Sequence, residues 1–162
     1  MRIVKGNPLN SNADAILHQV NCQGLSISDV AREIKDRYPV VYDMYKARCD
    51  EHEKIVKETG IDIYPLLGLA QICYKEDYPV TDVRDTQVIV NLFSQNLSSN
   101  NIPYTDYGAL RKALEQIDSQ FAGRTVAISL ETSDRQSNDR KIVSKIIKEA
   151  LSNCNVVAYC CN

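Results

Sequence analysis

One stretch near the start of the sequence constrains the fold more than any other. Ala15 to Val20 form an apolar run interrupted only by His18 and Gln19, a pattern typical of a strand buried on both faces. The run ends at Asn21-Cys22-Gln23-Gly24, where amide side chains and a glycine replace the apolar residues. Ligands of open α/β sheets bind at the carboxyl ends of strands, and an amide can read a pair of ribose hydroxyls. The sequence therefore predicts a ligand site at this strand end.

Composition limits the class of protein and of partner. The chain has 162 residues, a length typical of one domain, so residues 1–162 are predicted to form a single domain. The formal net charge is −2 and no basic run is present, which argues against a nucleic-acid partner. No apolar stretch approaches the roughly 20 residues that span a bilayer, so no membrane partner is expected.

Cysteine and histidine content bears on metal binding and on location. The six cysteines show no Cys-x-x-Cys spacing, and only two histidines are available, so no metal site is predicted. The residues do not point to a cofactor, and none is predicted. Reduced thiols are the simpler interpretation of the cysteines, which favours a cytoplasmic location.

Apolar periodicity predicts alternating strands and helices. Strands are predicted at 1–5, 15–20, 68–74, 87–93, 125–130 and 155–161. Helices are predicted from Val30 to Tyr38, from Val41 to shortly before Gly60, from Thr105 to Phe121 and from Ile142 to Leu151. This order predicts an α/β fold, a three-layer α/β/α sandwich with a mixed central sheet.

Several motifs add a family resemblance to this pattern. They are the stretch Ala13 to Leu25, Lys5-Gly6-Asn7, Arg37-Tyr38-Pro39-x-Val41-Tyr42, Asn91-Leu92-Phe93-x-Gln95, and the segment from Tyr104 to Leu114. Together they resemble the macrodomains, which are ADP-ribose-binding modules, and most closely the branch with a His-Gln-Val-Asn-Cys-Gln-Gly motif. The resemblance runs over nearly the whole chain, and macrodomains have the sandwich fold predicted above.

The resemblance implies ligand contacts at several positions. Asp14 matches the aspartate that receives the adenine amino group, and Asn21 matches the asparagine that contacts the distal ribose. Gly24 matches a glycine that lets the backbone approach the ligand. The other candidates are the neighbours Ala15 and Cys22 and the cleft-wall residues Asn91, Phe93 and Gln95.

Each of the main candidates also has a purely structural interpretation. Asp14 suits a turn before a strand, and Asn21 suits a strand-ending amide that is bonded to the local backbone. Gly24 suits a turn as well. Phe93 suits the core better than a ligand contact, and His18, inside the strand, suits the core better than the role of a catalytic base.

The first phosphate loop departs from the family pattern. Macrodomains have a glycine-rich loop here, whose amides hold the diphosphate at a helix amino terminus. This chain instead has Leu25-Ser26-Ile27-Ser28-Asp29, in which Ser26 and Asp29 suit a capping box. Two unit charges about 5 Å apart repel by roughly 3 kcal/mol at an effective dielectric of about 20. The Asp29 carboxylate is therefore expected to weaken diphosphate binding.

The second phosphate loop departs as well. Where the family reads Ile-Gly-Cys-Gly-Leu, this chain has Glu131-Thr132-Ser133-Asp134-Arg135. Arg135 and Arg140 would suit replacement contacts to phosphate, because guanidinium groups match phosphate oxygens. The alternative is a solvated charged loop that leads into a helix cap at Ser137 or Asn138.

The residues offer little support for catalysis. The terminal ADP-ribose protein glycohydrolase, a distantly similar enzyme of this branch, uses a lysine nucleophile and an aspartate. Those positions fall on Gln95 and Gln136, and glutamine can neither form the covalent sugar adduct nor exchange a proton near neutral pH. Only Asn21 and Asp134 remain as weak catalytic candidates.

Three functions stay open at this point. The favoured one is binding of ADP-ribose or a related NAD-derived nucleotide, free or on an ADP-ribosylated protein, by a macrodomain with remodelled phosphate loops. The second is an ADP-ribosyl or ADP-ribose 1″-phosphate hydrolase, against which the missing lysine and glycines argue. The third is a ligand-free scaffold for protein interaction, against which Asp14, Asn21, Gly24 and Gln95 argue.

Overall fold

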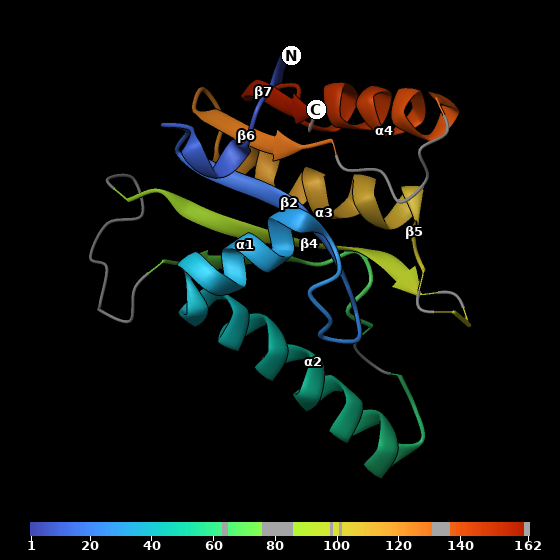
Figure 1. Ribbon diagram of the computed structural model, residues 1–162. Helices are drawn as coiled ribbons and strands as arrows, with labels where there is room; N and C mark the ends of the chain where they lie inside the picture. Colours follow the sequence, from blue (N-terminus) through green and yellow to red (C-terminus); the bar gives the residue numbers. More distant parts are fainter. Residues whose placement is uncertain (63–64, 76–85, 98, 101, 131–136, 161–162) are drawn as a thin grey trace.

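A seven-stranded mixed sheet forms the centre of the molecule (Figure 1). The computed structural model describes residues 1–62, 65–75, 86–97, 99–100, 102–130 and 137–160. The strands are β1 (Arg2–Lys5), β2 (Ala15–Asn21), β3 (Ala70–Tyr74), β4 (Val88–Leu97), β5 (Pro103–Thr105), β6 (Thr125–Ser129) and β7 (Asn155–Cys160). The helices are a 3-10 turn η1 (Pro8–Asn10), α1 (Asp29–Arg37), α2 (Pro39–Thr59), α3 (Tyr107–Gln120) and α4 (Ser137–Ala150).

Strand β2 lies in the middle of the sheet. The strand order is β1-β7-β6-β2-β4-β3, and the short β5 pairs with the far end of β4. β2 runs parallel to both of its neighbours, β4 and β6, whereas β3 and β5 run antiparallel to β4. The carboxyl ends of β2, β4 and β6 therefore meet at one edge of the sheet, which is where the sequence predicts a ligand site.

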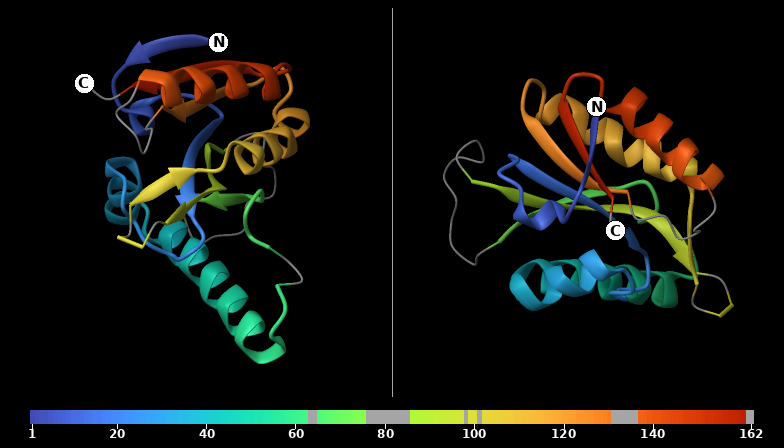
Figure 2. Two further views of the ribbon diagram at one scale, coloured as in Figure 1. Left: turned by 90° about the vertical axis from the view of Figure 1, so that its right-hand side faces the viewer. Right: turned by 45° about the horizontal axis from the view of Figure 1, so that its top comes forward.

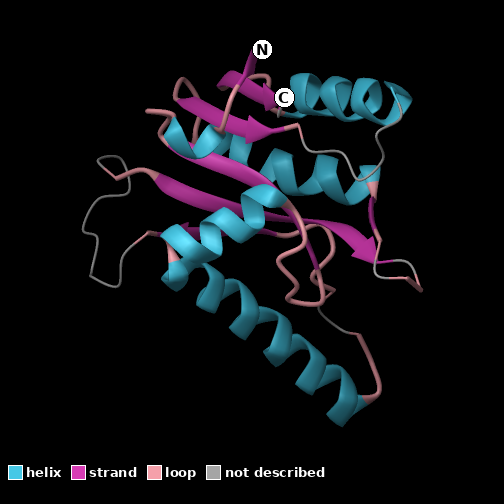
Figure 3. Ribbon diagram, in the orientation of Figure 1, coloured by secondary structure: helices cyan, strands magenta, loops and turns pink. Residues whose placement is uncertain are grey.

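The helices cover the two faces of the sheet as separate layers. Helices α1 and α2 lie on one face and α3 and α4 on the other (Figures 2 and 3). Residues of α3 and α4 pack with Leu17, Val90 and Ile128 in one core cluster, and residues of α1 pack with Ile16 and Ile89 in a second. All seven residues of β2 are buried, as expected of a strand covered on both faces. The predicted three-layer α/β/α sandwich with a mixed sheet is thus confirmed.

Strand β5 is one element that the sequence analysis did not predict. It spans only Pro103–Thr105 and pairs with Gln95–Leu97, too short a run for any apolar alternation to be visible. Helix α3 follows it and begins at Tyr107, where the Asp106 side chain accepts a hydrogen bond from the amide of Ala109 at 2.8 Å. Asp106 is therefore the amino-terminal cap of α3.

Three properties of the described residues limit what the chain can hold. None of the helices among them is long and apolar enough to cross a membrane. No three of their histidine, cysteine or acidic side chains are grouped so as to bind a metal ion. Five of their cysteines are free thiols, namely Cys22, Cys49, Cys73, Cys154 and Cys160.

Candidate functional site

Asn21 and Gln95 lie side by side at the carboxyl edge of the sheet. They are register partners at the ends of the parallel strands β2 and β4, with 2% and 8% of their surfaces exposed. Residues 21–28, called here the Asn21 loop, connect β2 to the amino terminus of α1. The sheet topology thus brings two of the predicted site residues together at the expected edge.

The Asn21 side chain organises its own loop. Its Oδ1 accepts hydrogen bonds from the backbone amides of Gln23 at 3.0 Å and Leu25 at 3.2 Å, and its Nδ2 donates to the Leu25 carbonyl at 2.7 Å. These contacts match the structural interpretation of Asn21, an amide bonded to the local backbone. The side chain fixes the loop as an Asx-type turn, so its effect on a ligand would act through the loop backbone.

Tyr45 of α2 supports the same turn, a role that the sequence analysis did not predict. Its hydroxyl donates to the Asn21 backbone carbonyl at 2.8 Å and to Asn21 Oδ1 at 2.9 Å. Burial raises the pKa of the Tyr45 phenol far above its usual value, so the hydroxyl keeps its proton and remains a donor. A buried tyrosine needs a hydrogen-bond partner, and this is the one signal that could have indicated its role.

Gly24 occupies a backbone position that strongly favours glycine. Its φ of +77° lies in the left-handed region, and a Cβ there would lie 2.8 Å from Lys46 Cδ and 3.6 Å from Cys49 Cβ. Helix α2 therefore packs directly against the backbone of the Asn21 loop. The positive φ is what favours glycine here, whatever ligand approaches the other side, because the closest atom belongs to a flexible lysine side chain that can move.

The amino terminus of α1 is capped differently from the predicted capping box. The cap is Ser28, whose Oγ accepts a hydrogen bond from the amide of Ala31 at 3.0 Å, and the helix begins at Asp29. Asp29 points outward, with 86% of its side chain exposed, and pairs with Arg32 at 3.2 Å. The prediction of a box from Ser26 to Asp29 was wrong by two residues, because spacing alone does not show where the helix begins.

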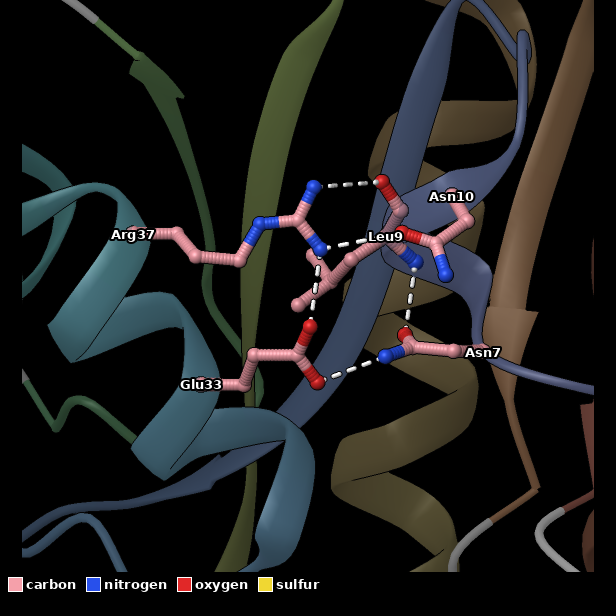
Figure 4. A network of polar contacts seen from close by, with 5 residues as sticks. All are labelled: Asn7, Leu9, Asn10, Glu33 and Arg37. Atoms are coloured by element: carbon pink, nitrogen blue, oxygen red, sulfur yellow. Dashed lines mark hydrogen bonds and ion pairs between the residues drawn. The ribbon is translucent and has the colours of Figure 1, made fainter.

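A polar network anchors α1 to the turn after β1 (Figure 4). Asn7 caps η1 through the amide of Leu9 at 2.9 Å and donates from its Nδ2 to Glu33 at 2.5 Å. Arg37 donates to Glu33 at 2.7 Å, to the Asn10 side chain at 3.0 Å and to the Leu9 carbonyl at 3.4 Å. These bonds fix the position of the helix whose first turn borders the Asn21 loop.

Asp14 and Ala15 lie at the opposite end of β2 from Asn21. One oxygen of Asp14 accepts a hydrogen bond from the amide of Thr125 at 2.9 Å, and the other lies 3.6 Å from Arg124. Ala15 is fully buried between its strand neighbours. Seven residues of extended strand cover roughly 23 Å, so Asp14 is far from Asn21. The observed contacts of Asp14 are those of a turn residue, and the adenine contact that the resemblance implies stays a prediction.

Asn91 and Phe93 are parts of the interior. Asn91 is 1% exposed and donates from its Nδ2 to Gln71 Oε1 at 3.0 Å, while its Oδ1 lies 2.6 Å from His18 Nε2. Phe93 is 1% exposed and packs on Tyr45, with ring centroids 5.8 Å apart. Phe93 thus lies in the core, as the sequence analysis favoured, while Asn91 is buried and borders a small space beside His18.

His18 is a core residue, as the sequence analysis favoured. Burial lowers its pKa to about 4, against the opposing effect of the hydrogen bond to Asn91, so the ring is neutral at physiological pH. Because the amide oxygen of Asn91 only accepts, His18 carries its proton on Nε2. The histidine therefore links β2 to β4 and is not placed to exchange protons with a ligand.

The remaining candidate residues fall into three groups. Cys22, although it follows Asn21, lines a cavity on the α2 side of the loop together with Cys49. Ser26 borders a small internal space beside His18, while Ile27 is half-buried. The candidates Glu131, Thr132, Ser133, Asp134 and Arg135 all lie outside the described residues.

Comparison with known proteins gives a structural match and no sequence match. No family model matches the chain, and no curated protein matches it in sequence. The fold is similar to the macrodomain of Thermus aquaticus DarG, with a TM-score of 0.69 at 17% identity over 99% of this chain and 97% of that one.

Two further solved structures extend this likeness. The macrodomain of Mycobacterium tuberculosis DarG matches with a TM-score of 0.69 at 17% identity, over 98% of this chain and 95% of that one. Thermosipho africanus DarTG in complex with ADP-ribose matches with a TM-score of 0.67 at 14% identity, over 98% of this chain and 40% of that one. The sheet order, the helix layers and these matches together show that the chain has the macrodomain fold.

Proposed function

We propose that this chain binds ADP-ribose or a related NAD-derived nucleotide at the carboxyl edge of β2 and β4. The observation that carries the proposal is the Asn21 loop, a turn fixed by Asn21, Tyr45 and Gly24 directly before the amino terminus of α1. A similarly folded protein, Thermosipho africanus DarTG, is described in complex with ADP-ribose. A rigid backbone turn at this edge is suited to a nucleotide in such a fold.

The first turn of α1 supplies the chemistry for a phosphate. The amino end of a helix carries a partial positive charge, which favours anions. The Asp29 carboxylate points outward and pairs with Arg32, so it opposes a phosphate less than the sequence suggested. The proposed diphosphate therefore lies beside residues 26–29, in a loop that lacks the glycines of the family pattern.

Binding is favoured here over hydrolysis. Asn21 Oδ1 already accepts hydrogen bonds from Gln23, Leu25 and Tyr45, which leaves it unsuited to orient an attacking water. Gln95 adds an amide at the same edge, and amides do not exchange protons near neutral pH. We therefore propose that the chain binds the free nucleotide, or ADP-ribose attached to a protein, without hydrolysing it.

Calorimetric titration tests this proposal. ADP-ribose, AMP, ADP and cyclic ADP-ribose are titrated in turn into the parent chain, and we expect saturable binding of one ADP-ribose per chain. Gly24→Ala should weaken it by about tenfold or more, equivalent to about 1.4 kcal/mol, because the loop must move.

The matched control is Gly123→Ala. Gly123 has a nearly equal φ of +75° but open space around the position of a Cβ, in a turn far from the Asn21 loop. This variant should lose stability and keep the affinity of the parent chain. Absence of saturable heat with every nucleotide of the panel would show that the proposed function is wrong.

A further inference from the structure

The carboxyl-terminal half of α2 extends beyond the sheet (Figure 1). The buried residues of α2 are Val41, Tyr45 and Cys49, and in this fully described helix none of residues 50–59 is buried. Helices in proteins owe most of their stability to the packing of an apolar face. Almost three turns of α2 therefore contribute no buried residue to the core, although His52, Ile55 and Val56 are half-buried.

A cavity of about 440 Å³ lies between this helix end and the Asn21 loop. Its volume falls within the range of about 300–1,000 Å³ that is usual for ligand pockets. Its apolar lining includes Cys22, Cys49 and Val56, and its carboxylates are Asp50, Glu53 and Asp62. It shares Cys22 and Gln23 with the Asn21 loop but is otherwise formed by α2 and Asp62, so it lies on the α2 side of that loop.

The charge around this cavity is negative. Its lining contains three acids, Asp50, Glu53 and Asp62, and one lysine, Lys57, a formal charge of −2. The thiols add no charge, because burial raises the pKa of Cys22 to about 11 and that of Cys49 to about 12. A phosphate would be repelled here, and a cation with an aliphatic stem would be attracted.

The carboxylates of the cavity remain available to such a cation. Glu53 pairs with Lys57 at 2.7 Å and Asp62 with His52 at 2.8 Å, and both acids have about half or more of their side chains exposed, at 63% and 49%. Exposed pairs of this kind contribute little to stability, so an incoming guanidinium group can replace them at small cost. Its planar fork also binds a carboxylate through two hydrogen bonds.

We propose that this cavity is a docking site for an arginine or lysine side chain of a partner polypeptide, with the rest of the partner lying along the exposed end of α2. The stem of the side chain lies against Cys22, Cys49 and Val56, and its charged head bonds Glu53 and Asp62. This protein-binding surface would be a second function, and its existence does not depend on nucleotide binding.

A nuclear magnetic resonance titration tests the site with a defined probe. The ¹⁵N-labelled chain is titrated with the peptide acetyl-Gly-Arg-Gly-amide and with the same peptide carrying citrulline, which is neutral and nearly the same shape. The arginine peptide should shift the amide signals of Cys22, Cys49 and Val56, and added salt should reduce the shifts. Equal shifts from the citrulline peptide would overturn the proposal.

Charge-matched variants separate the cavity from general attraction. The double variant Glu53→Gln/Asp62→Asn should bind the arginine peptide about tenfold more weakly, the usual scale for a lost charged hydrogen bond. The control Glu51→Gln/Glu58→Gln removes the same charge from acids of α2 that do not line the cavity, and it should change affinity less than about twofold. An equal loss in both variants would contradict a specific site.

A nucleotide titration keeps this test separate from that of the proposed function. ADP-ribose is titrated into both double variants, and its affinity should equal that of the parent chain. Peptide binding without nucleotide binding would leave the docking site standing and remove only the proposed function. A loss of nucleotide affinity confined to Glu53→Gln/Asp62→Asn would contradict the separation of the two sites.

Discussion

The hydroxyl of Tyr45 donates to both the backbone carbonyl and the side-chain oxygen of Asn21, at 2.8 and 2.9 Å. This contact joins the middle of α2 to the end of the central strand, across 24 positions of sequence. It links the Asn21 loop, part of the proposed nucleotide site, directly to helix α2. The conformation of the loop therefore depends on the packing of α2.

Tyr45→Phe tests this dependence. The variant keeps the ring packed on Phe93 but removes the donor, so Asn21 loses one of its partners at each oxygen. We expect a loss of about 1 kcal/mol in the free energy of unfolding, measured by urea denaturation, together with weaker ADP-ribose binding. Tyr104→Phe, at a half-exposed position, is the control and should change neither quantity.

The neutral state of His18 predicts how stability depends on pH. Its folded pKa is about 4 and its unfolded value about 6.5, so the unfolded chain binds the extra proton first as pH falls. The stability that His18 contributes is complete above pH 6.5 and decreases as pH falls from 6.5 to 4, by about 3 kcal/mol. His18→Gln should remove this part of the slope. The free energy of unfolding is measured against pH in the parent chain and in this variant, and the difference isolates the contribution of His18 because the carboxylates titrate in both. Parallel curves would contradict the assignment.

Asp14 is expected to act on stability and not on binding. Asp14→Ala removes the acceptor of the Thr125 amide and the partner of Arg124, which should cost about 1–2 kcal/mol of stability. ADP-ribose affinity, measured by calorimetry, should be unchanged. Glu115→Ala, on the exposed side of α3, removes the same charge as a control. Weaker nucleotide binding by Asp14→Ala alone would restore the adenine role that the family resemblance implied.

The cap of α1 gives a direct test of where this helix begins. Ser28→Ala removes the side chain that accepts from the Ala31 amide and should lower the free energy of unfolding by about 1 kcal/mol. Ser26→Ala, which changes the residue that the sequence suggested as the cap, should have a clearly smaller effect. Thermal or urea unfolding of the two variants decides between the caps, and the reverse order of effects would contradict the observed one.

Asp29 is predicted to weaken phosphate binding only slightly. Asp29→Asn keeps the size of the side chain and removes a charge that is exposed and paired with Arg32. ADP-ribose affinity should increase less than about tenfold, and the gain should decrease at high salt because exposed charges are screened. A much larger gain that persists in salt would mean that the carboxylate turns inward toward the ligand.

The fold could be predicted from the sequence because its signals are local and repeated. The apolar run from Ala15 to Val20 and the stripe of Leu110, Leu114 and Ile117 reflect burial against neighbours on both sides, which any such sheet or helix imposes. Strand β5 was missed because three residues carry no periodicity, and Ser28 was missed as a cap because spacing allowed several starts for α1.

The candidate site depended on contacts that are remote in sequence. The sequence by itself determined that the central strand ends at Asn21 and that Gln95 lies near the end of another. Only the tertiary structure decided that Asn21 is bound by Tyr45, that Asn91 bonds His18 in the core, and that Asp14 lies at the far edge of the sheet. The physical reason is that the alternation of a strand fixes on which face of the sheet each side chain lies. The edge of the sheet that a residue reaches, and the residue that it bonds, depend on how the chain crosses over from one strand to the next.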